Sequence, residues 1–199
     1  MKSVQQFLLF RRFLEAVMIA LEFAQTDALL AWESWKCNCG PSALAAVIGL
    51  SLDQVRPFVE KSGFAEKGYM APTMMKTALA AAGWHIAIAN RCGKDLGTRF
   101  PNLGLARIQW TGPWTAEGAN PKWAYRQTHW VASWVLPQKD SKEPVIFDIN
   151  GGLLRQSEWE KTIVPLITAS VPRADGGWFL THSWEVVRSQ HPPAEAGGL

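Results

Sequence analysis

The sequence has few cysteines: only Cys37, Cys39 and Cys92 occur among 199 residues. This small number excludes a disulfide framework, and a single residue between Cys37 and Cys39 would badly strain a bridge between them. Free cysteines are typical of a reducing compartment, so we expect a cytoplasmic protein. A zinc site built from the cysteines and a histidine would lack the usual C-x₂-C and H-x₃-H spacings. We therefore expect no metal and no other cofactor.

The sequence also lacks a large excess of either positive or negative charge. The net charge is only +3, charged residues make up 19% of the chain, and no cluster of four or more Lys or Arg occurs. A mild, scattered charge does not form the basic patch that nucleic-acid binding requires, so we expect no nucleic-acid partner. The hydrophobic fraction of 48% is ordinary for a globular protein.

The sequence also lacks a long uninterrupted apolar run. The apolar N-terminal stretch is divided by charged residues at Arg11, Arg12, Glu15 and Glu22. No segment of secretory or membrane-spanning length remains, so we expect no membrane span. Apolar residues recur there at helical spacing instead, at Phe10, Leu14, Val17 and Leu21. This pattern predicts an amphipathic helix within an N-terminal extension, residues 1–30, that docks on the rest of the protein.

Tryptophan is abundant, with eleven residues against two tyrosines, and such rigid apolar rings suit a core or a groove. Helices are expected over residues 4–24, from Cys39 onward, over 51–63 and over 71–84. Short runs rich in Trp, Ile, Val and Phe then predict strands over 84–90, 104–110, 129–136, 144–150 and 178–187. Helices followed by strands predict a single α+β domain over residues 1–187, with N-terminal helices packed on an antiparallel sheet. Residues 188–199 are predicted to form a disordered tail.

Cys39 is the candidate nucleophile. It is followed by Gly40 and Pro41, and proline is favoured in the first turn of a helix. Cys39 would then lie at a helix N-terminus, where the macrodipole stabilises a thiolate. The alternative is a small buried core residue, which free cysteines often are. Cys37 is interpreted as a packing residue.

His129 is the candidate base, because it opens a predicted strand directly after the long loop 111–127. His191 lies in the predicted tail and is excluded. His85 and His182 lie inside predicted strands, and His182, in the similar phrase THSW, is the rival of His129.

Asp148 is the candidate partner that orients His129. It lies near the end of the next predicted strand, and adjacent antiparallel strands place the start of one beside the end of the other. Asn150, two residues later on the same strand face, is the alternative, since either side chain can orient an imidazole. Cys39, His129 and Asp148 would then form a nucleophile, a base and an orienting group.

Three segments, NCGPSALAAVIGLSLDQV, THWVASW and VIFDING, together resemble the papain-like cysteine peptidases. They are most similar to the bacteriocin-processing peptidase domains of export transporters and to the stand-alone relatives of those domains. Cys, His and Asp occur there in the same order with comparable gaps, and the resemblance spans about residues 37–152. It implies a papain-like fold and a triad of Cys39, His129 and Asp148 that attacks a protein or peptide substrate through a thioester. The segments GLARIQWTGPW, YRQTHWV and PRADGGWFLTHSWEV are also similar to uncharacterised phage and prophage proteins with the same Cys–His–Asp order.

The sequence departs from that family just before Cys39. The family has a glutamine five or six residues before the cysteine as an oxyanion-hole donor, whereas Glu33 and Ser34 stand here. The backbone N–H of Cys39 supplies one donor, and Asn38 and Trp35 are candidates for the second. Loss of one such donor typically costs ~10²–10³ in rate. Two alternatives therefore stay open: an inactive papain-fold binding protein of phage or prophage origin, and a transglutaminase-like acyltransferase.

The loop 111–127 is the candidate wall of the substrate groove, because long loops in compact domains are often functional. Its Trp114 and Trp123 are predicted to contact the substrate. Asn38, beside the nucleophile, and Trp130, beside the base, are predicted to contribute further contacts.

Overall fold

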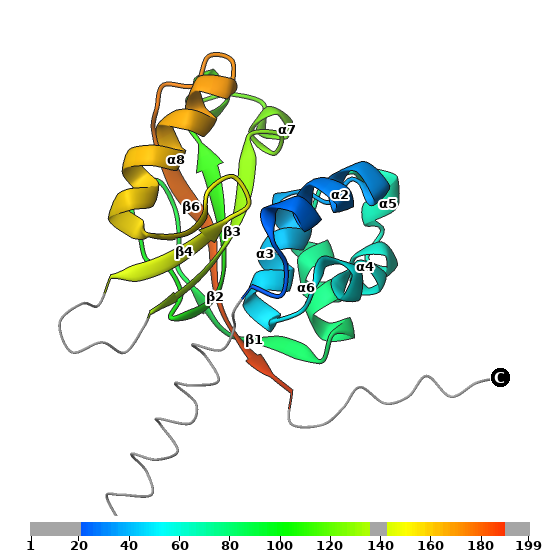
Figure 1. Ribbon diagram of the computed structural model, residues 1–199. Helices are drawn as coiled ribbons and strands as arrows, with labels where there is room; N and C mark the ends of the chain where they lie inside the picture. Colours follow the sequence, from blue (N-terminus) through cyan, green and yellow to red (C-terminus); the bar gives the residue numbers. More distant parts are fainter. Residues whose placement is uncertain (1–20, 136–142, 190–199) are drawn as a thin grey trace, which may run out of the picture.

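The computed structural model describes residues 21–135 and 143–189. The helices of the N-terminal half pack against a six-stranded antiparallel sheet (Figure 1), which confirms the predicted α+β class. Most of the predicted N-terminal extension and nearly all of the predicted C-terminal tail lie outside the described residues.

Five helices form the layer that carries Cys39: α2 (Gln25–Trp35), α3 (Cys39–Ile48), α4 (Leu52–Lys61), α5 (Phe64–Lys67) and α6 (Pro72–Ala81). Helix α3 lies at the centre, and all its residues from Gly40 to Ile48 are buried. Its small side chains at Ala43, Ala45 and Ala46 allow the helix to approach strand β3 closely. The predicted boundary at residue 30 falls inside α2, whose Ala28, Ala31 and Trp35 belong to the same core.

The sheet consists of β1 (Trp84–Asn90), β2 (Leu103–Trp110), β3 (Thr128–Val135), β4 (Pro144–Asp148), β5 (Gly152–Arg155) and β6 (Trp178–Arg188). The spatial order is β1-β6-β2-β3-β4-β5, so the last strand inserts between the first two. Gly104 permits this insertion, because a Cβ at that position would lie 1.8 Å from the carbonyl oxygen of Trp184 on β6. Arg188, predicted to belong to the tail, is the last residue of β6.

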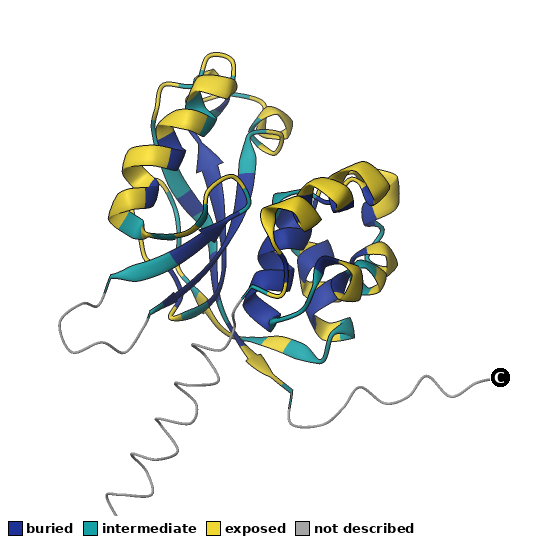
Figure 2. Cartoon of the chain, in the orientation of Figure 1, coloured by how far each residue is buried: buried dark blue, intermediate teal, exposed yellow. Residues whose placement is uncertain are grey.

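Helix α8 (Gln156–Ser170) covers the opposite face of the sheet, and Figure 1 shows it across the strands from α3. The central strands β2, β3 and β4 are therefore largely buried on both faces, as the dark band in Figure 2 shows, whereas the edge strands β1 and β5 are partly exposed. One core lies between the sheet and α2–α6, and a second lies between the sheet and α8. Helix α8 and strand β5 were not predicted from the sequence.

The loop between β2 and β3 contains a 3₁₀ turn, η1 (Pro113–Thr115), and a short helix, α7 (Pro121–Ala124). Gln109 anchors this loop, because its side-chain amide donates to the backbone carbonyls of Ala124 and Gln127 at 3.0 and 2.9 Å. Within the described residues, no single helix is long and apolar enough to cross a membrane, and only α3 and α4 together, bent by 117°, reach that length and composition.

Candidate active site

Cys39 is the first residue of α3, as the Gly-Pro context predicted. Asn38 caps this helix, since its side-chain oxygen accepts a hydrogen bond from the backbone N–H of Gly40 at 3.2 Å. Gly40 is required for close packing, because a Cβ there would lie 2.3 Å from the Cβ of Met70. The thiol of Cys39 is consequently held at the positive end of a buried helix, in a half-buried position.

His129 and Asp148 are joined by a hydrogen bond of 2.9 Å between Nε2 and Oδ2. The strand register brings them together: β3 and β4 are antiparallel, and Ala132 pairs with Phe147, so the start of β3 lies beside the end of β4. Both side chains are buried. Because Nε2 faces Asp148, Nδ1 is the nitrogen of His129 that remains for the thiol.

Asp148 is held by four hydrogen bonds. Its Oδ2 accepts from His129 and, at 2.8 Å, from the indole N–H of Trp159 on α8. Its Oδ1 accepts from the backbone and side-chain N–H groups of Asn150 at 2.9 and 3.0 Å. Asn150 therefore bonds to Asp148, and the structure places the carboxylate of Asp148 beside His129.

Aromatic rings support the imidazole from the α8 side of the sheet. The ring of His129 lies 6.0 Å from that of Trp110, which in turn stacks on Trp159 at 6.4 Å. Trp159 thus serves two purposes, since it packs on this stack and donates to Asp148. Buried hydrogen bonds and rigid rings together restrict the orientation of His129.

The electrostatic environment favours a charged pair between Cys39 and His129. Burial by itself would raise the pKa of the Cys39 thiol, but the charge of His129, a hydrogen bond with it and a backbone hydrogen bond from Trp130 lower that pKa below its ordinary value. Burial would likewise lower the pKa of His129, yet the negative charges of Asp148 and Cys39 and their hydrogen bonds raise it well above the ordinary value. Thiolate and imidazolium therefore stabilise each other.

Asp148 completes this arrangement as a carboxylate. Burial opposes its ionisation, but the charge of His129 and hydrogen bonds from His129, Trp159 and Asn150 lower the pKa of Asp148 below its ordinary value. A carboxylate that accepts several hydrogen bonds from buried donors remains ionised at neutral pH. The directions of the three pKa shifts thus favour alternating charge along the site, negative at Cys39, positive at His129 and negative at Asp148.

The other two cysteines have the opposite character. Cys37 is buried, its Sγ lies 3.4 Å from the Ser42 hydroxyl, and burial raises its pKa to about 11. Burial also raises the pKa of Cys92. All three thiols are free, and among the described residues no group of three or more His, Cys, Asp and Glu side chains is arranged to hold a metal ion.

His182 lies on β6 and lacks the environment of a base. Its ring packs 5.0 Å from Trp184 and 6.2 Å from Trp130, and its Nδ1 bonds to the Thr181 hydroxyl at 3.1 Å. Burial and the charges of Arg107 and Lys76 lower its pKa to about 4. His182 is therefore neutral at physiological pH, whereas the pKa of His129 is raised.

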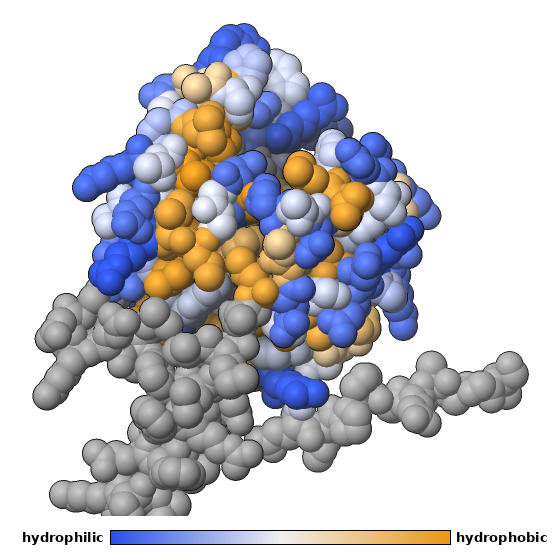
Figure 3. Space-filling model, in the orientation of Figure 1, coloured by the Kyte–Doolittle hydropathy of each residue, from blue (hydrophilic) through white to orange (hydrophobic). Residues whose placement is uncertain are grey.

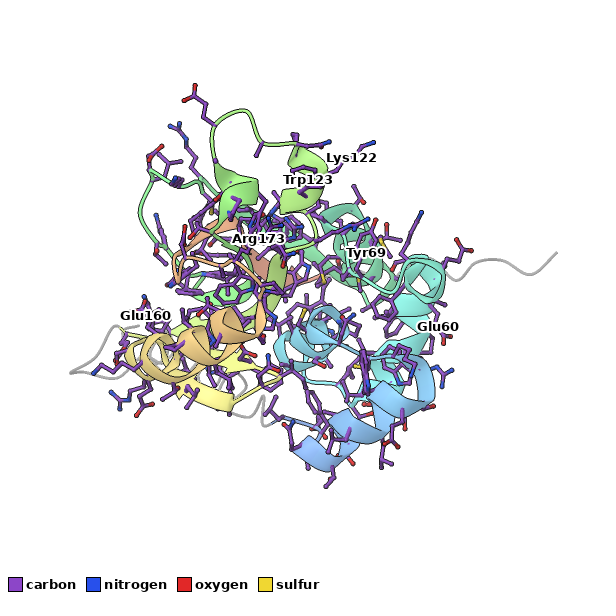
Figure 4. The ribbon with its side chains drawn as sticks, turned by 90° about the horizontal axis from the view of Figure 1, so that it is seen from above. Glu60, Tyr69, Lys122, Trp123, Glu160 and Arg173 are labelled. Carbon is purple, nitrogen blue, oxygen red and sulfur yellow. The ribbon has the colours of Figure 1, made fainter. Side chains whose placement is uncertain are left out.

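Two cavities meet at Asn38 and Cys39. One, of about 340 Å³, lies between α2 and the β4–β5 turn and is lined by Gln25, Ala28, Leu29, Trp32, Cys37, Asn38, Cys39, His129, Ile149 and Asn150. The other, of about 630 Å³, is lined by Asn38, Cys39, Tyr69, Met70, Ala71, Lys122, Tyr125, Arg126, Thr128 and Trp130. Both Tyr69 and Lys122 line the second cavity, and Figure 4 shows that Tyr69 comes from the helical layer and Lys122 from α7. Cys39, the candidate nucleophile, thus lies where the two cavities meet.

The predicted substrate contacts divide between two places. Asn38 and Trp130 lie at the cavities beside Cys39, and the indole N–H of Trp130 donates to the carbonyl of Met70 at 2.7 Å. Trp114 and Trp123 instead line a separate cavity together with Arg126 and Arg173. Trp114 belongs to the 3₁₀ turn η1. Its position is fixed because its indole N–H donates to the carbonyl oxygen of Trp110, at the end of β2, at 2.7 Å. The loop 111–127 does border the site, but through Lys122, Tyr125 and Arg126.

The two candidates for the second oxyanion donor lie in different places. Asn38 lines both cavities at Cys39, and its side-chain amide directs one of its two N–H groups to the carbonyl of Gly68 at 3.1 Å. The indole nitrogen of Trp35 has no hydrogen-bond partner, but its ring packs between Phe64 and Arg56 and lines neither cavity at Cys39. Gln25 on α2, in contrast, lines the same cavity as Cys39 and His129.

The sequence did not single out Trp110, Trp159 or Arg107, although each shapes the site. The only sequence signal for Arg107 and Trp110 was the alternation of side chains along the predicted strand 104–110. This alternation places the charge of Arg107 and the ring of Trp110 on opposite faces of the strand. The role of Trp159 could be predicted only with knowledge of α8. This helix brings the indole back to Asp148, which lies 11 residues earlier in the sequence.

No protein-family model, no curated protein and no solved structure matches this chain. Of the resemblance noted in the sequence, the structure bears out the coarser part, N-terminal helices packed against an antiparallel sheet.

Proposed function

We propose that this protein is a cysteine hydrolase of the papain-like type, which cleaves amide or isopeptide bonds in a protein or peptide. The observation that carries the proposal is the continuous chain from Cys39 through His129 to Asp148, at the junction of two cavities. Among the three thiols only Cys39 has a lowered pKa, and it is the cysteine that lines both cavities.

In the proposed reaction, the Cys39 thiolate attacks the carbonyl carbon and forms a tetrahedral oxyanion. His129 then donates its Nδ1 proton to the leaving amine, the C–N bond breaks, and a thioester remains on Cys39. Neutral His129 next removes a proton from water, which attacks the thioester and releases a carboxylic acid and the thiol. Asp148 keeps the Nε2–H of His129 directed away from the substrate throughout.

The oxyanion requires two donors. The backbone N–H of Cys39 at the start of α3 is one, because the first N–H groups of a helix have no partner inside it. Gln25 is the proposed source of the second, since this residue lines the cavity shared by Cys39 and His129 and carries a side-chain amide. Gln25, at the start of α2, would then replace the glutamine side chain that papain-like peptidases carry at the positions of Glu33 and Ser34.

The surface around Cys39 suits an extended chain. The cavity on the His129 side is mostly apolar, with Ala28, Leu29, Trp32 and Ile149 in its lining. Figure 3 shows hydrophobic side chains over α2 on this face, where Leu29 is 57% exposed. The second cavity continues past Cys39 toward Tyr125. A polypeptide crossing the nucleophile would therefore occupy both hollows.

A peptide library made from a digested bacterial proteome tests this proposal. Incubation in H₂¹⁸O should create new N-termini, each paired with a new C-terminal carboxylate that has gained one ¹⁸O from hydrolysis of the thioester. The same library treated with Cys39→Ser, which replaces the thiol with a weakly nucleophilic hydroxyl of similar size, should show no new termini. Liquid chromatography with mass spectrometry detects both features.

Two other outcomes would overturn the hydrolase assignment. A labelled primary amine joined to peptides in a Cys39-dependent way, without ¹⁸O, would identify an acyltransferase. Identical peptides from wild type and Cys39→Ser, with no amine incorporated, would favour a binding protein that retains the arrangement without the chemistry.

A further inference from the structure

The larger cavity at Cys39 has a distinctive charge. Among its lining residues, Lys122 and Arg126 are cationic, and no aspartate or glutamate is present. Both cations are exposed and lie at the end of the β2–β3 loop, close to the start of β3. The mouth of the cavity is therefore positive, in a protein whose overall charge is mild.

A third cation lies behind the cavity wall. Arg107 on β2 is only 5% exposed, and its guanidinium donates to the hydroxyls of Thr128 at 3.0 Å and Thr181 at 3.3 Å. The guanidinium carbon lies 5.3 Å from the ring centre of Tyr125, and both Tyr125 and Thr128 line the cavity. Its Nε has no hydrogen-bond partner, and no described carboxylate forms an ion pair with it. A buried charge without a counter-ion is rare and costly.

The charge of Arg107 also reaches Cys39. Burial lowers the pKa of Arg107, while electrostatic interactions with Tyr125 and Cys39 act in the opposite direction. The same guanidinium helps to lower the pKa of His182 on the neighbouring strand. Arg107 therefore contributes a positive field at the back of a cavity that Lys122 and Arg126 flank at the front.

We propose that this cavity binds a carboxylate of the substrate next to the bond that Cys39 attacks. The inference rests on the proposed function and narrows its substrate class to peptides with an acidic group beside the scissile bond. An aspartate or glutamate side chain and a free C-terminal carboxylate present the same chemistry to these three cations. The apolar cavity on the other side of Cys39 would hold uncharged residues.

The test compares alkylation of Cys39 by iodoacetate, which is anionic, and by iodoacetamide, which is neutral. In both reactions the thiolate displaces iodide and a C–S bond forms. The ratio of the two second-order rate constants should fall about fivefold in the double variant Lys122→Gln/Arg126→Gln. His129 is unchanged in this variant, so the change in ratio isolates the cavity. The matched control Lys61→Gln/Lys161→Gln removes two exposed cations on α4 and α8 and should keep the wild-type ratio.

Protection experiments distinguish the two sources of carboxylate. N-acetyl-glutamate amide carries only a side-chain carboxylate, N-acetyl-glutamine only a terminal one, and N-acetyl-glutamine amide has none. One or both acidic compounds should slow the iodoacetamide reaction of wild-type Cys39 more than the neutral compound does, and this difference should disappear in the double variant.

The inference and the proposed function fail in different ways. An equal ratio in wild type and in Lys122→Gln/Arg126→Gln, with Cys39 still fast toward iodoacetamide, would overturn the carboxylate site and leave the hydrolase intact. Slow reaction of Cys39 with both reagents would overturn the hydrolase, and the inference with it.

Discussion

Replacement of His129 by alanine should slow the alkylation of Cys39 by iodoacetamide about 100-fold at about pH 6. The charge of His129 and its hydrogen bond are the main influences that lower the pKa of the thiol. Once they are removed, burial and the charge of Asp148 raise that pKa, opposed only by the backbone hydrogen bond from Trp130. The thiolate fraction at mildly acidic pH therefore falls steeply, and the rate follows because only the thiolate reacts. Quenched time points analysed by peptide mapping give the rate constant at each cysteine.

Two histidine variants serve as controls for this experiment. His85→Ala alters an exposed residue at the end of β1 that bonds to Ser189, and it should leave the rate at Cys39 unchanged. His182→Ala removes the rival base, and the rate should again stay near that of wild type because the ring of His182 packs on Trp130 and Trp184. A rate that falls with His182→Ala and not with His129→Ala would reverse the assignment.

Replacement of Asp148 by alanine should lower the free energy of unfolding by about 3 kcal/mol at about pH 5. The variant removes the acceptor of four hydrogen bonds and leaves the His129 imidazolium and the Trp159 indole buried without it. Urea denaturation followed by tryptophan fluorescence measures the loss.

The loss should depend on pH in a defined direction. The pKa of Asp148 is lowered on folding, so its contribution is present above the ordinary value of 3.8 and disappears as the pH falls through the folded value. The pKa of His129 is raised, so its contribution is present below 6.5 and disappears as the pH rises through the folded value. The cost of Asp148→Ala should consequently be greatest between these two ordinary values and smaller in alkaline solution.

Asp148→Asn is the matched variant, because it keeps the shape of the side chain and one acceptor oxygen. The free energy of unfolding of this variant should fall by an intermediate amount. One oxygen of the asparagine still accepts hydrogen bonds from one pair of donors, either His129 and Trp159 or the two N–H groups of Asn150, and the other pair faces the NH₂ group. An equal cost of Asp148→Ala in acidic and alkaline solution would contradict an ion pair at this site. It would indicate hydrogen bonding between neutral groups.

The strands were the part of the fold that the sequence predicted best. The strand predicted over 84–90 matches β1 at both ends, and the others lie within two residues of β2, β3, β4 and β6. Runs of β-branched and aromatic residues bounded by Gly, Pro and Asn carry this signal locally. The start of α3 at Cys39 was equally accessible, because the Gly-Pro pair and the small residues behind it are contiguous.

Other elements were missed because their signal is weak or long-range. Helix α8 contains Pro165, which removes one backbone donor and obscures the helical pattern. Helix α2 was not predicted: the expected helix ended at residue 24, whereas the chain is irregular from Leu21 to Ala24 and α2 begins at Gln25. The positions of Trp114 and Trp123 depend on how η1 and α7 turn the loop, which residue spacing does not reveal.

The pairing of Cys39 with His129 is tested most directly by the pH dependence of alkylation in the wild-type protein. Iodoacetamide rates at all three cysteines, measured by mass spectrometry from about pH 4 to about pH 10, give three profiles in one sample. The profile of Cys39 should rise at a pH below the ordinary thiol value of 9.0 and that of Cys92 above it, whereas Cys37, with a pKa of about 11, should still react slowly at the end of the series. A Cys39 profile that coincides with that of Cys92 would contradict the thiolate–imidazolium pair and the function proposed from it.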